Sequence, residues 1–334
     1  MKRKIAIIAG GDSSEYEVSL RSAAGIESFL ADQKQYTTTI VLLRGQDWKV
    51  KVGENEWVAI DKNDFSYTLN GEKRTFDFAY ITIHGTPGEN GVLQGYFDMI
   101  GLPYSCCGVL AAAMTFNKYT CNHYLKGFGV RVAESILLRK SDTQYPISNI
   151  PNLVGLPCFI KTNVGGSSFG VTKVKTVEEV KPAIDKAFAE GDEVICEAFM
   201  QGIEITCGAY KTRDKAVAFP ITEVVTNNEF FDYDAKYNGQ VDEITPARIP
   251  DEVRDAVQAM TLKIYDILGC KGIIRIDYIL TGDEAKGERL EINLLEVNTT
   301  PGMTATSFIP QQVRAAGLNI GEVLSEIVED NFTV

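Results

Sequence analysis

Residues 272–304 read GIIRIDYILTGDEAKGERLEINLLEVNTTPGMT, a pattern that predicts two apolar β-strands joined by a short polar turn. Arg275 and Asp277 are two residues apart in the first strand, so the alternation of a strand places both on one face. If the chain folds back near residues 286–287, antiparallel pairing puts Asp277 opposite Glu296. The pattern therefore predicts that carboxylates from two strands meet on one face.

The second strand carries polar groups at its end. Leu290, Ile292 and Leu294 alternate on one face, and the same spacing continues through Glu296 and Asn298. Burying a carboxylate on an apolar face is costly unless a cation meets it. Oxygen ligands from Asp, Glu and Asn suit a hard divalent cation, Mg²⁺ above all. A surface hairpin with solvated acids is the alternative interpretation.

The composition is that of a soluble globular protein. The 334 residues are 45% hydrophobic and 23% charged, enough for two or three domains. The net charge of −12 argues against nucleic acid or an anionic membrane as the main partner. No apolar run is long enough for a signal peptide or a membrane span. The seven scattered cysteines include no C-x-x-C pair, which favours reduced thiols and a cytoplasmic location.

The first region alternates strands with helices. Strands are predicted over residues 4–9, 37–43 and 76–83, which favours a parallel sheet with helices on both sides. Ligands of such sheets bind beyond the carboxyl ends of the strands. Gly10-Gly11 and His84-Gly85 lie at those ends. The first region is therefore expected to present a ligand-binding edge.

A glycine-rich segment, GGSSFG at residues 165–170, follows a predicted strand at residues 156–162. Its backbone N–H groups and two hydroxyls can wrap phosphate oxygens, although it is not a Walker A loop. A bare flexible hairpin is the alternative. Lys161, which shares a face with Phe159, favours the phosphate interpretation because a half-buried ammonium needs an anion.

The stretch from Glu197 to Glu204 reads as a strand end followed by a turn. Its backbone groups could hydrogen-bond a flat base edge, with Phe199 and Met200 as apolar cover and Glu204 on ribose hydroxyls. A linker with two exposed glutamates explains the same residues, so both interpretations stay open.

Three single residues are weaker candidates. Glu15 follows the first strand, where a carboxylate either caps a helix or faces a ligand. Lys118 begins a predicted helix and alone would be an ordinary solvated lysine, whereas His84 ends a buried strand. His123, the other histidine, is interpreted as structural.

Residues 227–246 form an irregular stretch whose length is typical of functional loops. Its aromatic residues predict a lid that closes over a ligand. Together with a phosphate-binding hairpin, a base-binding hinge and a carboxylate metal site, this lid indicates nucleotide phosphoryl transfer without a P-loop. Arg275, beside the metal site, could stabilise an anionic intermediate.

Six blocks occur in an order that resembles the D-alanine–D-alanine ligase family of the ATP-grasp superfamily, over nearly the whole chain. They are GGDSSEYEVSL, HGTPGENGVLQGYFDMIGLPYSCCG, GGSSFG, FFDYDAKY, RIDY and EVNTTPGMT. The resemblance implies an α/β and α+β fold with three domains: an N-terminal parallel α/β domain at residues 1–106 with the first D-alanine site, a central ATP-grasp subdomain at 107–200 with the phosphate loop, and a C-terminal subdomain at 201–334 with the lid and the Mg²⁺ site. It implies ATP-dependent ligation of two D-alanines through an acyl phosphate, for peptidoglycan precursor synthesis in the cytoplasm.

The resemblance also implies roles for individual residues. The ATP contacts would be Lys118, Lys161, Ser168, Glu197, Ala198, Phe199, Met200, Glu204 and Lys236. Two Mg²⁺ ions, with Mn²⁺ as an alternative, would be bound by Asp277, Glu296 and Asn298. His84 would line the first D-alanine site, and Ser307 would orient the carboxylate of the second D-alanine.

The same resemblance implies a reaction sequence. Glu15 would hold the ammonium of the first D-alanine, tied through Ser167 to Tyr237. The carboxylate of this D-alanine would attack the γ-phosphate, and the amine of the second D-alanine would attack the acyl phosphate. Arg275 and the Gly302 amide would stabilise the tetrahedral oxyanion.

Three residues depart from the pattern of the family, namely Asn117, Thr162 and Phe231. The retained Lys236-Tyr237 pair favours a dipeptide product over D-alanyl-D-lactate. A D-alanine–D-serine or another carboxylate–amine ligase is the alternative, and a non-catalytic nucleotide-binding module is a further one. The expected partners are D-alanine and ATP, with no nucleic acid and no membrane, and a homodimer is left open.

Overall fold

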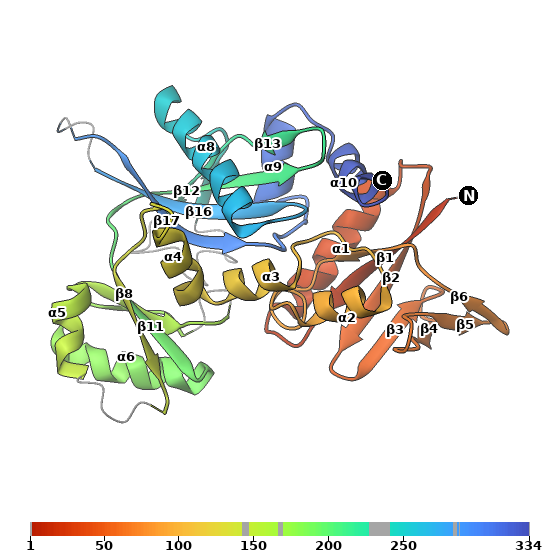
Figure 1. The fold of residues 1–334 in the computed structure, drawn as a ribbon, viewed down its shortest axis with the longest axis horizontal. Coiled ribbons are helices and arrows are strands. Elements are labelled where there is room, and N and C mark those ends of the chain that lie inside the picture. The colour runs from red at the N-terminus through yellow and green to blue at the C-terminus, as the bar shows by residue number, and fades with distance from the viewer. Residues whose placement is uncertain are drawn as a thin grey trace.

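The computed structural model describes residues 2–141, 147–165, 170–226, 241–282, 286 and 288–333. Three larger sheets follow one another along the chain, and helices α3 and α4 run between the first two (Figure 1). A small two-stranded ribbon extends from the first sheet, formed by β5 (Tyr67–Leu69) and β6 (Glu72–Arg74).

The N-terminal sheet has five strands in the order β4-β3-β2-β1-β7. Its strands are β1 (Arg3–Gly10), β2 (Tyr36–Arg44), β3 (Asp47–Lys51), β4 (Trp57–Ala59) and β7 (Phe78–Ile81). Strand β1 pairs in parallel with β2 and β7, as predicted. The expectation of a wholly parallel sheet is wrong at one edge, where β3 and β4 pair antiparallel. The two-residue link between β2 and β3 is too short for the crossover that parallel strands need.

Strand β1 is buried on both sides because helices cover both faces of this sheet. Ile5 and Ile7 pack with α1 (Tyr16–Leu30), whereas Ala6 and Ile8 pack with α2 (Val92–Ile100). The predicted arrangement of helices on both sides is therefore confirmed.

The central sheet is antiparallel, in the order β10-β9-β11-β8. Its strands are β8 (Ser135–Arg139), β9 (Cys158–Thr162), β10 (Thr172–Val174) and β11 (Glu193–Ala198). The helices of this region are α3 (Val109–Phe116), α4 (Lys118–Lys126), α5 (Ile150–Val154) and α6 (Val177–Glu190), with a 3-10 turn at Ile147–Asn149. The Asn117 side chain caps α4 by accepting a hydrogen bond from the Thr120 amide, as an aspartate would.

The C-terminal sheet runs β15-β14-β12-β16-β17, with β13 also paired to β12. Its strands are β12 (Gly202–Lys211), β13 (Ala216–Ala218), β14 (Thr222–Thr226), β15 (Val241–Ile244), β16 (Ile274–Thr281) and β17 (Glu291–Asn298). The helices are α8 (Asp251–Leu268), α9 (Phe308–Ala315) and α10 (Ile320–Asp330). Strand β15 lies inside the stretch interpreted as irregular loop, so that prediction is wrong for residues 241–244; residues 227–240 lie outside the described part.

The hairpin of β16 and β17 has the predicted register, with Asp277 paired to Glu296. One detail of the prediction is wrong. A bulge leaves Leu295 unpaired, because Tyr278 pairs with Leu294 while the preceding Asp277 pairs with Glu296. The extra residue reverses the alternation, so Leu294 packs in the core beneath α8 while Glu296 faces the cavity described below. Glu296 and Asn298 therefore do not share the face of Leu290, Ile292 and Leu294.

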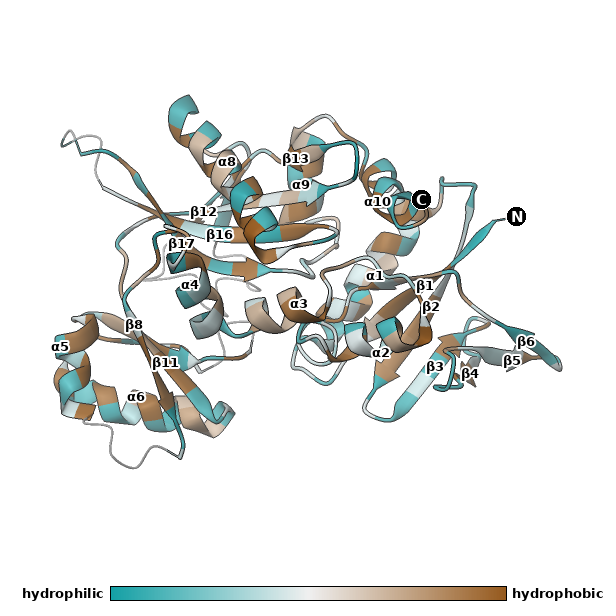
Figure 2. Ribbon diagram, in the orientation of Figure 1, coloured by the Kyte–Doolittle hydropathy of each residue, from teal (hydrophilic) through white to brown (hydrophobic). Residues whose placement is uncertain are grey.

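The C-terminal helices pack against the N-terminal sheet. Residues of α10 join β1 and α1 in one buried cluster, and Figure 2 shows the hydrophobic strands that form these interiors. The Arg3 side chain of β1 forms an ion pair with Glu329 of α10 at 3.0 Å. No helix that the structure describes is long and apolar enough to cross a bilayer. All seven cysteines are buried, and none is paired in a disulfide.

Candidate active site

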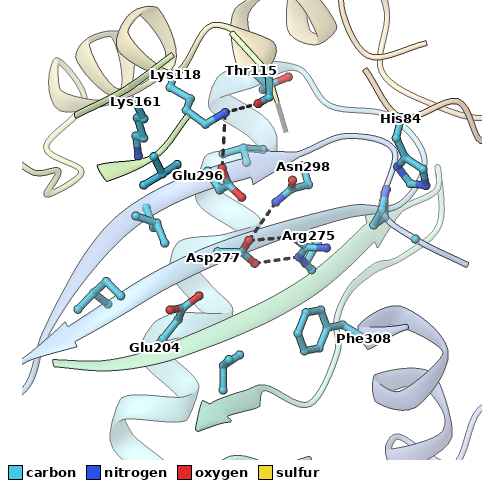
Figure 3. A pocket seen from close by; sticks show the side chains of 18 of the residues that line it. His84, Thr115, Lys118, Lys161, Glu204, Arg275, Asp277, Glu296, Asn298 and Phe308 are labelled. Atoms are coloured by element: carbon cyan, nitrogen blue, oxygen red, sulfur yellow. Dashed lines mark hydrogen bonds and ion pairs between the residues drawn. The ribbon is translucent and has the colours of Figure 1, made fainter. Parts of the chain in front are cut away.

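One cavity of about 980 Å³ lies between the three sheets (Figure 3). The predicted site residues that the structure describes all line it: Glu15, His84, Lys118, Lys161, Glu197, Ala198, Phe199, Met200, Glu204, Arg275, Asp277, Glu296, Asn298, Gly302 and Ser307. Four predicted residues, Ser167, Ser168, Lys236 and Tyr237, lie outside the described part, as does Phe231. The volume is at the upper end of the range for small-molecule sites.

The Asp277 carboxylate accepts four hydrogen bonds in the cavity wall. Its two oxygens accept hydrogen bonds from Arg275 Nε and Nη2, both at 2.9 Å, as Figure 3 shows. Thr206 Oγ1 and Asn298 Nδ2 donate to the same carboxylate at 2.6 and 3.1 Å. Burial alone would lower the pKa of Arg275, but the charge of Asp277 and its hydrogen bonds raise it. The Arg275 guanidinium therefore stays charged in the cavity wall.

Glu296 lies across the strand pair from Asp277 and 3.8 Å from the Lys118 ammonium. Among the described lining residues, eight are Asp or Glu and four are Lys or Arg. A polyphosphate would meet net negative charge in such a wall unless divalent cations came with it. The described residues contain no group of three or more His, Cys, Asp or Glu side chains that could hold a metal. The predicted set of two carboxylates and one amide, all oxygen donors, nevertheless fits the chemistry of Mg²⁺.

Lys161 points from β9 into the cavity, and its ammonium lies 2.7 Å from Glu197 Oε2. Burial would lower the pKa of Lys161, but the charge and hydrogen bond of Glu197 raise it. The anion that pairs with this almost buried lysine is therefore Glu197, a residue that the resemblance places at the adenine site. Lys118 is not an ordinary solvated lysine, because its Nζ donates to the Gly165 carbonyl at 2.7 Å.

The turn after β11 presents few free backbone donors. The Ala198 amide donates to the Glu134 carbonyl, and the Phe199 amide donates to that of Pro157. Within the described ranges, the Met200 amide has no hydrogen-bond partner. Apolar side chains also line the cavity: Phe159, Phe199, Ile203, Val224, Ile279 and Leu295. A flat heterocycle could stack between them with one edge on the Met200 amide.

The opposite end of the cavity is formed by the N-terminal region. Glu15 is the N-cap residue of α1, but its side chain makes no capping hydrogen bond and lines the cavity. His84 is buried, and its Nε2 has no hydrogen-bond partner among the described residues. A buried ring nitrogen without a partner is costly, so it is poised for a bound ligand. His123 lies outside the cavity lining, and its Nδ1 is 3.0 Å from the Tyr119 carbonyl, as expected for a structural residue.

The segment after β17 lines the cavity with residues 299–302. Pro301 has no N–H group, and the Met303 amide donates to Ser22 Oγ. The Gly302 amide has no partner in the described part of the chain. A Cβ at Gly302 would lie 2.9 Å from Ser307 Oγ, so these two residues adjoin.

The sequence interpretation missed several cavity residues. Glu89 accepts hydrogen bonds from the Gly85 amide at 2.6 Å and from Thr300 Oγ1 at 2.7 Å. Burial raises the pKa of its carboxyl, against the opposing charge of His84. Glu223 and Glu243 line the cavity from β14 and β15. Strand β14 pairs with β12, and β15 pairs with β14, so the order of the strands in the sheet brings both carboxylates to the cavity.

Two family models match the chain. The model "D-ala D-ala ligase N-terminus" matches residues 4–107, and "D-ala D-ala ligase C-terminus" matches residues 124–329. The D-alanine–D-alanine ligase of Phocaeicola vulgatus is 64% identical over 332 residues, which cover 99% of this chain and all of that protein.

Solved structures share the fold. The VanG D-Ala:D-Ser ligase from Enterococcus faecalis gives a TM-score of 0.86 at 28% identity, covering 99% of this chain and 100% of that one. The D-alanine–D-alanine ligase from Bacillus anthracis complexed with ATP gives 0.75 at 26% identity, covering 99% and 97%. The predicted fold class, an ATP-grasp ligase with an N-terminal parallel-sheet domain, is confirmed.

Proposed function

Because this chain belongs to the D-ala D-ala ligase family, we propose that it joins two D-alanines to D-alanyl-D-alanine for peptidoglycan precursors. ATP is cleaved to ADP and phosphate in the reaction. The observation that carries the proposal is the meeting of two half-sites in one cavity: Lys118 and Lys161 on one wall, Arg275 and Asp277 on the other. This arrangement can bind a triphosphate next to groups that stabilise an anionic intermediate.

Nucleotide binding falls to the central region. The adenine edge meets the Met200 amide, and the ring stacks on Phe199. Glu204 binds the ribose hydroxyls, while Lys118 and Lys161 contact the phosphates. Lys161 would then exchange part of its contact with Glu197 for a phosphate oxygen, and the freed Glu197 carboxylate can accept from the adenine amino group. Ser168 and Lys236 complete this set.

Mg²⁺ belongs in the same proposal. Asp277, Glu296 and Asn298 would hold two ions, or Mn²⁺ in their place. Bound there, the ions would neutralise charge on the β- and γ-phosphates. The excess of carboxylates in the cavity wall supports this assignment. The eight described Asp and Glu side chains already outnumber the four Lys and Arg side chains before a negatively charged nucleotide binds.

The two chemical steps follow. Glu15, linked through Ser167 to Tyr237, holds the ammonium of the first D-alanine, with His84 beside it. The carboxylate of this D-alanine attacks the γ-phosphorus, forming an acyl phosphate and releasing ADP.

The ammonium of the second D-alanine, oriented by Ser307, first gives up a proton to solvent, and the neutral amine then attacks the acyl carbon. Arg275 and the Gly302 amide stabilise the tetrahedral oxyanion, and phosphate leaves as the peptide bond forms. The Gly302 N–H, which lines the same cavity as Arg275 and has no partner among the described residues, supports this step.

A coupled assay of ADP formation tests the proposal. We expect ADP release with Mg²⁺-ATP and D-alanine, with D-alanyl-D-alanine as the product by mass spectrometry. No D-alanine-dependent ADP would refute it. The VanG similarity favours D-alanyl-D-serine as a second candidate product, so the assay includes D-serine and D-lactate as competing acceptors.

Three further properties belong to the proposal. Each of the ranges 1–106, 107–200 and 201–334 contains one of the larger sheets, which supports their assignment as domains. We place the reaction in the cytoplasm, where ATP is available. A homodimer is supported by exposed apolar side chains on the neighbouring helices α2 and α3: Val92, Met99, Val109 and Leu110.

A further inference from the structure

Glu243 is a cavity carboxylate whose role neither the motifs nor the mechanism above assigns. It lies on β15, directly opposite Val224 of β14, and Val224 lies opposite Glu204 of β12. All three side chains line the cavity. Glu243 therefore stands on the cavity side of the sheet, at its outer edge.

A fixed contact sets the position of Glu243 within the cavity. Gln311 Nε2 of α9 donates to Glu243 Oε2 and also to the Thr306 carbonyl, at 2.7 Å for the latter. Thr306 precedes Ser307, the residue proposed to orient the carboxylate of the second D-alanine. The Glu243 carboxylate is thus held beside the acceptor end of the cavity rather than beside Glu15.

The charge on Glu243 is poorly compensated. Asp277, Glu197 and Glu223 each have a basic partner, namely Arg275, Lys161 and Arg248. Among the described residues, Glu243 forms no ion pair, and its side-chain partner is the neutral amide of Gln311. Burial raises the pKa of the Glu243 carboxyl, and the Gln311 hydrogen bond and the Arg275 charge only partly oppose this. A cationic ligand group would complete the local charge balance.

In the mechanism above, only one of the two D-alanine substrates has an anionic side chain assigned to its ammonium group. Each D-alanine enters as a zwitterion. Moving its ammonium group from water into the cavity without a nearby anion would cost a desolvation free energy of several kcal/mol, as for other buried charges. Glu15 serves the first ammonium in the mechanism above. No residue named there serves the second.

We propose that Glu243 binds the ammonium group of the second, acceptor amino acid and selects amino acids over hydroxy acids at that position. This inference rests on the proposed function and adds the recognition of its acceptor. With Ser307 on the carboxylate and Glu243 on the ammonium, the acceptor is held at both polar ends beside Arg275. A hydroxy acid would leave the Glu243 charge unmatched, which disfavours it.

The test uses the full-length chain and separates the two D-alanine sites kinetically. In Glu243→Gln we expect the KM of the acceptor D-alanine to rise about tenfold to a hundredfold, the loss expected for a hydrogen bond between charged groups. The KM values of ATP and of the donor D-alanine should change less than twofold. The Ki of D-lactate, measured in competition with the acceptor, should not rise, because D-lactate has no ammonium.

Two variants control the test. Asp242→Asn removes a neighbouring charge on β15 from a residue outside the cavity lining, and should behave as the unmodified chain. Glu243→Asp keeps the charge and should restore part of the acceptor affinity.

The inference is overturned if the acceptor KM of Glu243→Gln stays within twofold of that of Asp242→Asn. It is also overturned if the KM values of ATP and both D-alanines rise together, since that pattern indicates a structural role for the Glu243–Gln311 contact. A failure of the proposed function is distinct, because the unmodified chain would then form no ADP with D-alanine.

Discussion

Lys161 Nζ and Glu197 Oε2 lie 2.7 Å apart on neighbouring strands of the central sheet, with both side chains almost buried. Neither charge can be removed alone without stranding the other in a low-dielectric wall. The pair also lies where the nucleotide is proposed to bind, so one contact couples the stability of the sheet to the affinity for ATP.

Replacement of Lys161 separates these two effects. Lys161→Met leaves Glu197 buried without its cation and should lower the free energy of unfolding by about 3–5 kcal/mol. The double variant Lys161→Met/Glu197→Gln should recover much of this loss, because no unpaired charge remains, while ATP affinity stays low. Urea unfolding and calorimetric titration with ATP measure the two quantities. Recovery of both together would contradict the proposed phosphate contact.

Arg275→Ala tests the stabilisation of the oxyanion. Turnover should fall by a factor of about 10² to 10³, as for loss of an oxyanion donor, while the Kd for ATP stays near that of the unmodified chain. Arg254→Ala, which removes an exposed arginine of α8 that pairs with Asp251 and Asp255, is the control. Unchanged turnover in Arg275→Ala would refute the assigned role.

Removal of divalent cations tests the metal site. EDTA should abolish ADP formation, and excess Mg²⁺ should restore it. Glu296→Gln should raise the Mg²⁺ concentration for half-maximal activity by about tenfold or more, the effect typical of altered metal surroundings. Glu291→Gln, on the same strand but paired with Arg131 at the surface, should leave that concentration unchanged. An equal shift in both variants would speak against Glu296 as a ligand.

The Glu223–Arg248 pair predicts a loss of stability in acid. Hydrogen bonds from Arg248 lower the pKa of the Glu223 carboxyl below its ordinary value of 4.5. A carboxylate with a lowered folded-state pKa stabilises the fold above its unfolded-state pKa, and this contribution is lost as the pH falls through the folded-state value. Thermal melting between pH 3 and 7 should therefore show a shallower acid dependence for Glu223→Gln. The exposed Glu252→Gln, at the start of α8, should keep the original slope.

A charge on the exposed face of α3 tests the proposed dimer. Leu110 is 74% exposed, so Leu110→Lys should not disturb the fold, yet it would bury a charge in an interface. Light scattering should then give the mass of two 36.8 kDa chains for the unmodified protein and of one for the variant. Val177→Lys, at an exposed valine of α6, is the matched control. A light-scattering mass of one chain for the unmodified protein would contradict the proposal that it forms a homodimer.

Sequence reasoning was most successful where a local pattern carries the information. The period-2 alternation of residues 274–281 placed Arg275 and Asp277 on one face, and their two hydrogen bonds confirm it. The same reasoning failed at Leu295, because a bulge depends on how a partner strand pairs and leaves no mark in the alternation. It also missed β3 at the sheet edge and β15 within the loop.

The amino-acid sequence by itself determined many of the elements, the pairing of Asp277 with Glu296 and the identity of the cavity residues that lie in motifs, since each follows from spacing within a short stretch. Only the tertiary structure decided that Lys161 meets Glu197, that Glu296 faces the cavity rather than the core, and that Gln311 connects Glu243 to the segment that leads into Ser307. These relationships join residues that are 36 or more positions apart or depend on a bulge, and they arise from strand pairing and charge balance in a shared wall. The sequence of the hairpin at residues 272–304 therefore predicts that Asp277 and Glu296 lie close together, whereas the packing of the whole fold decides which basic side chains and substrates contact them.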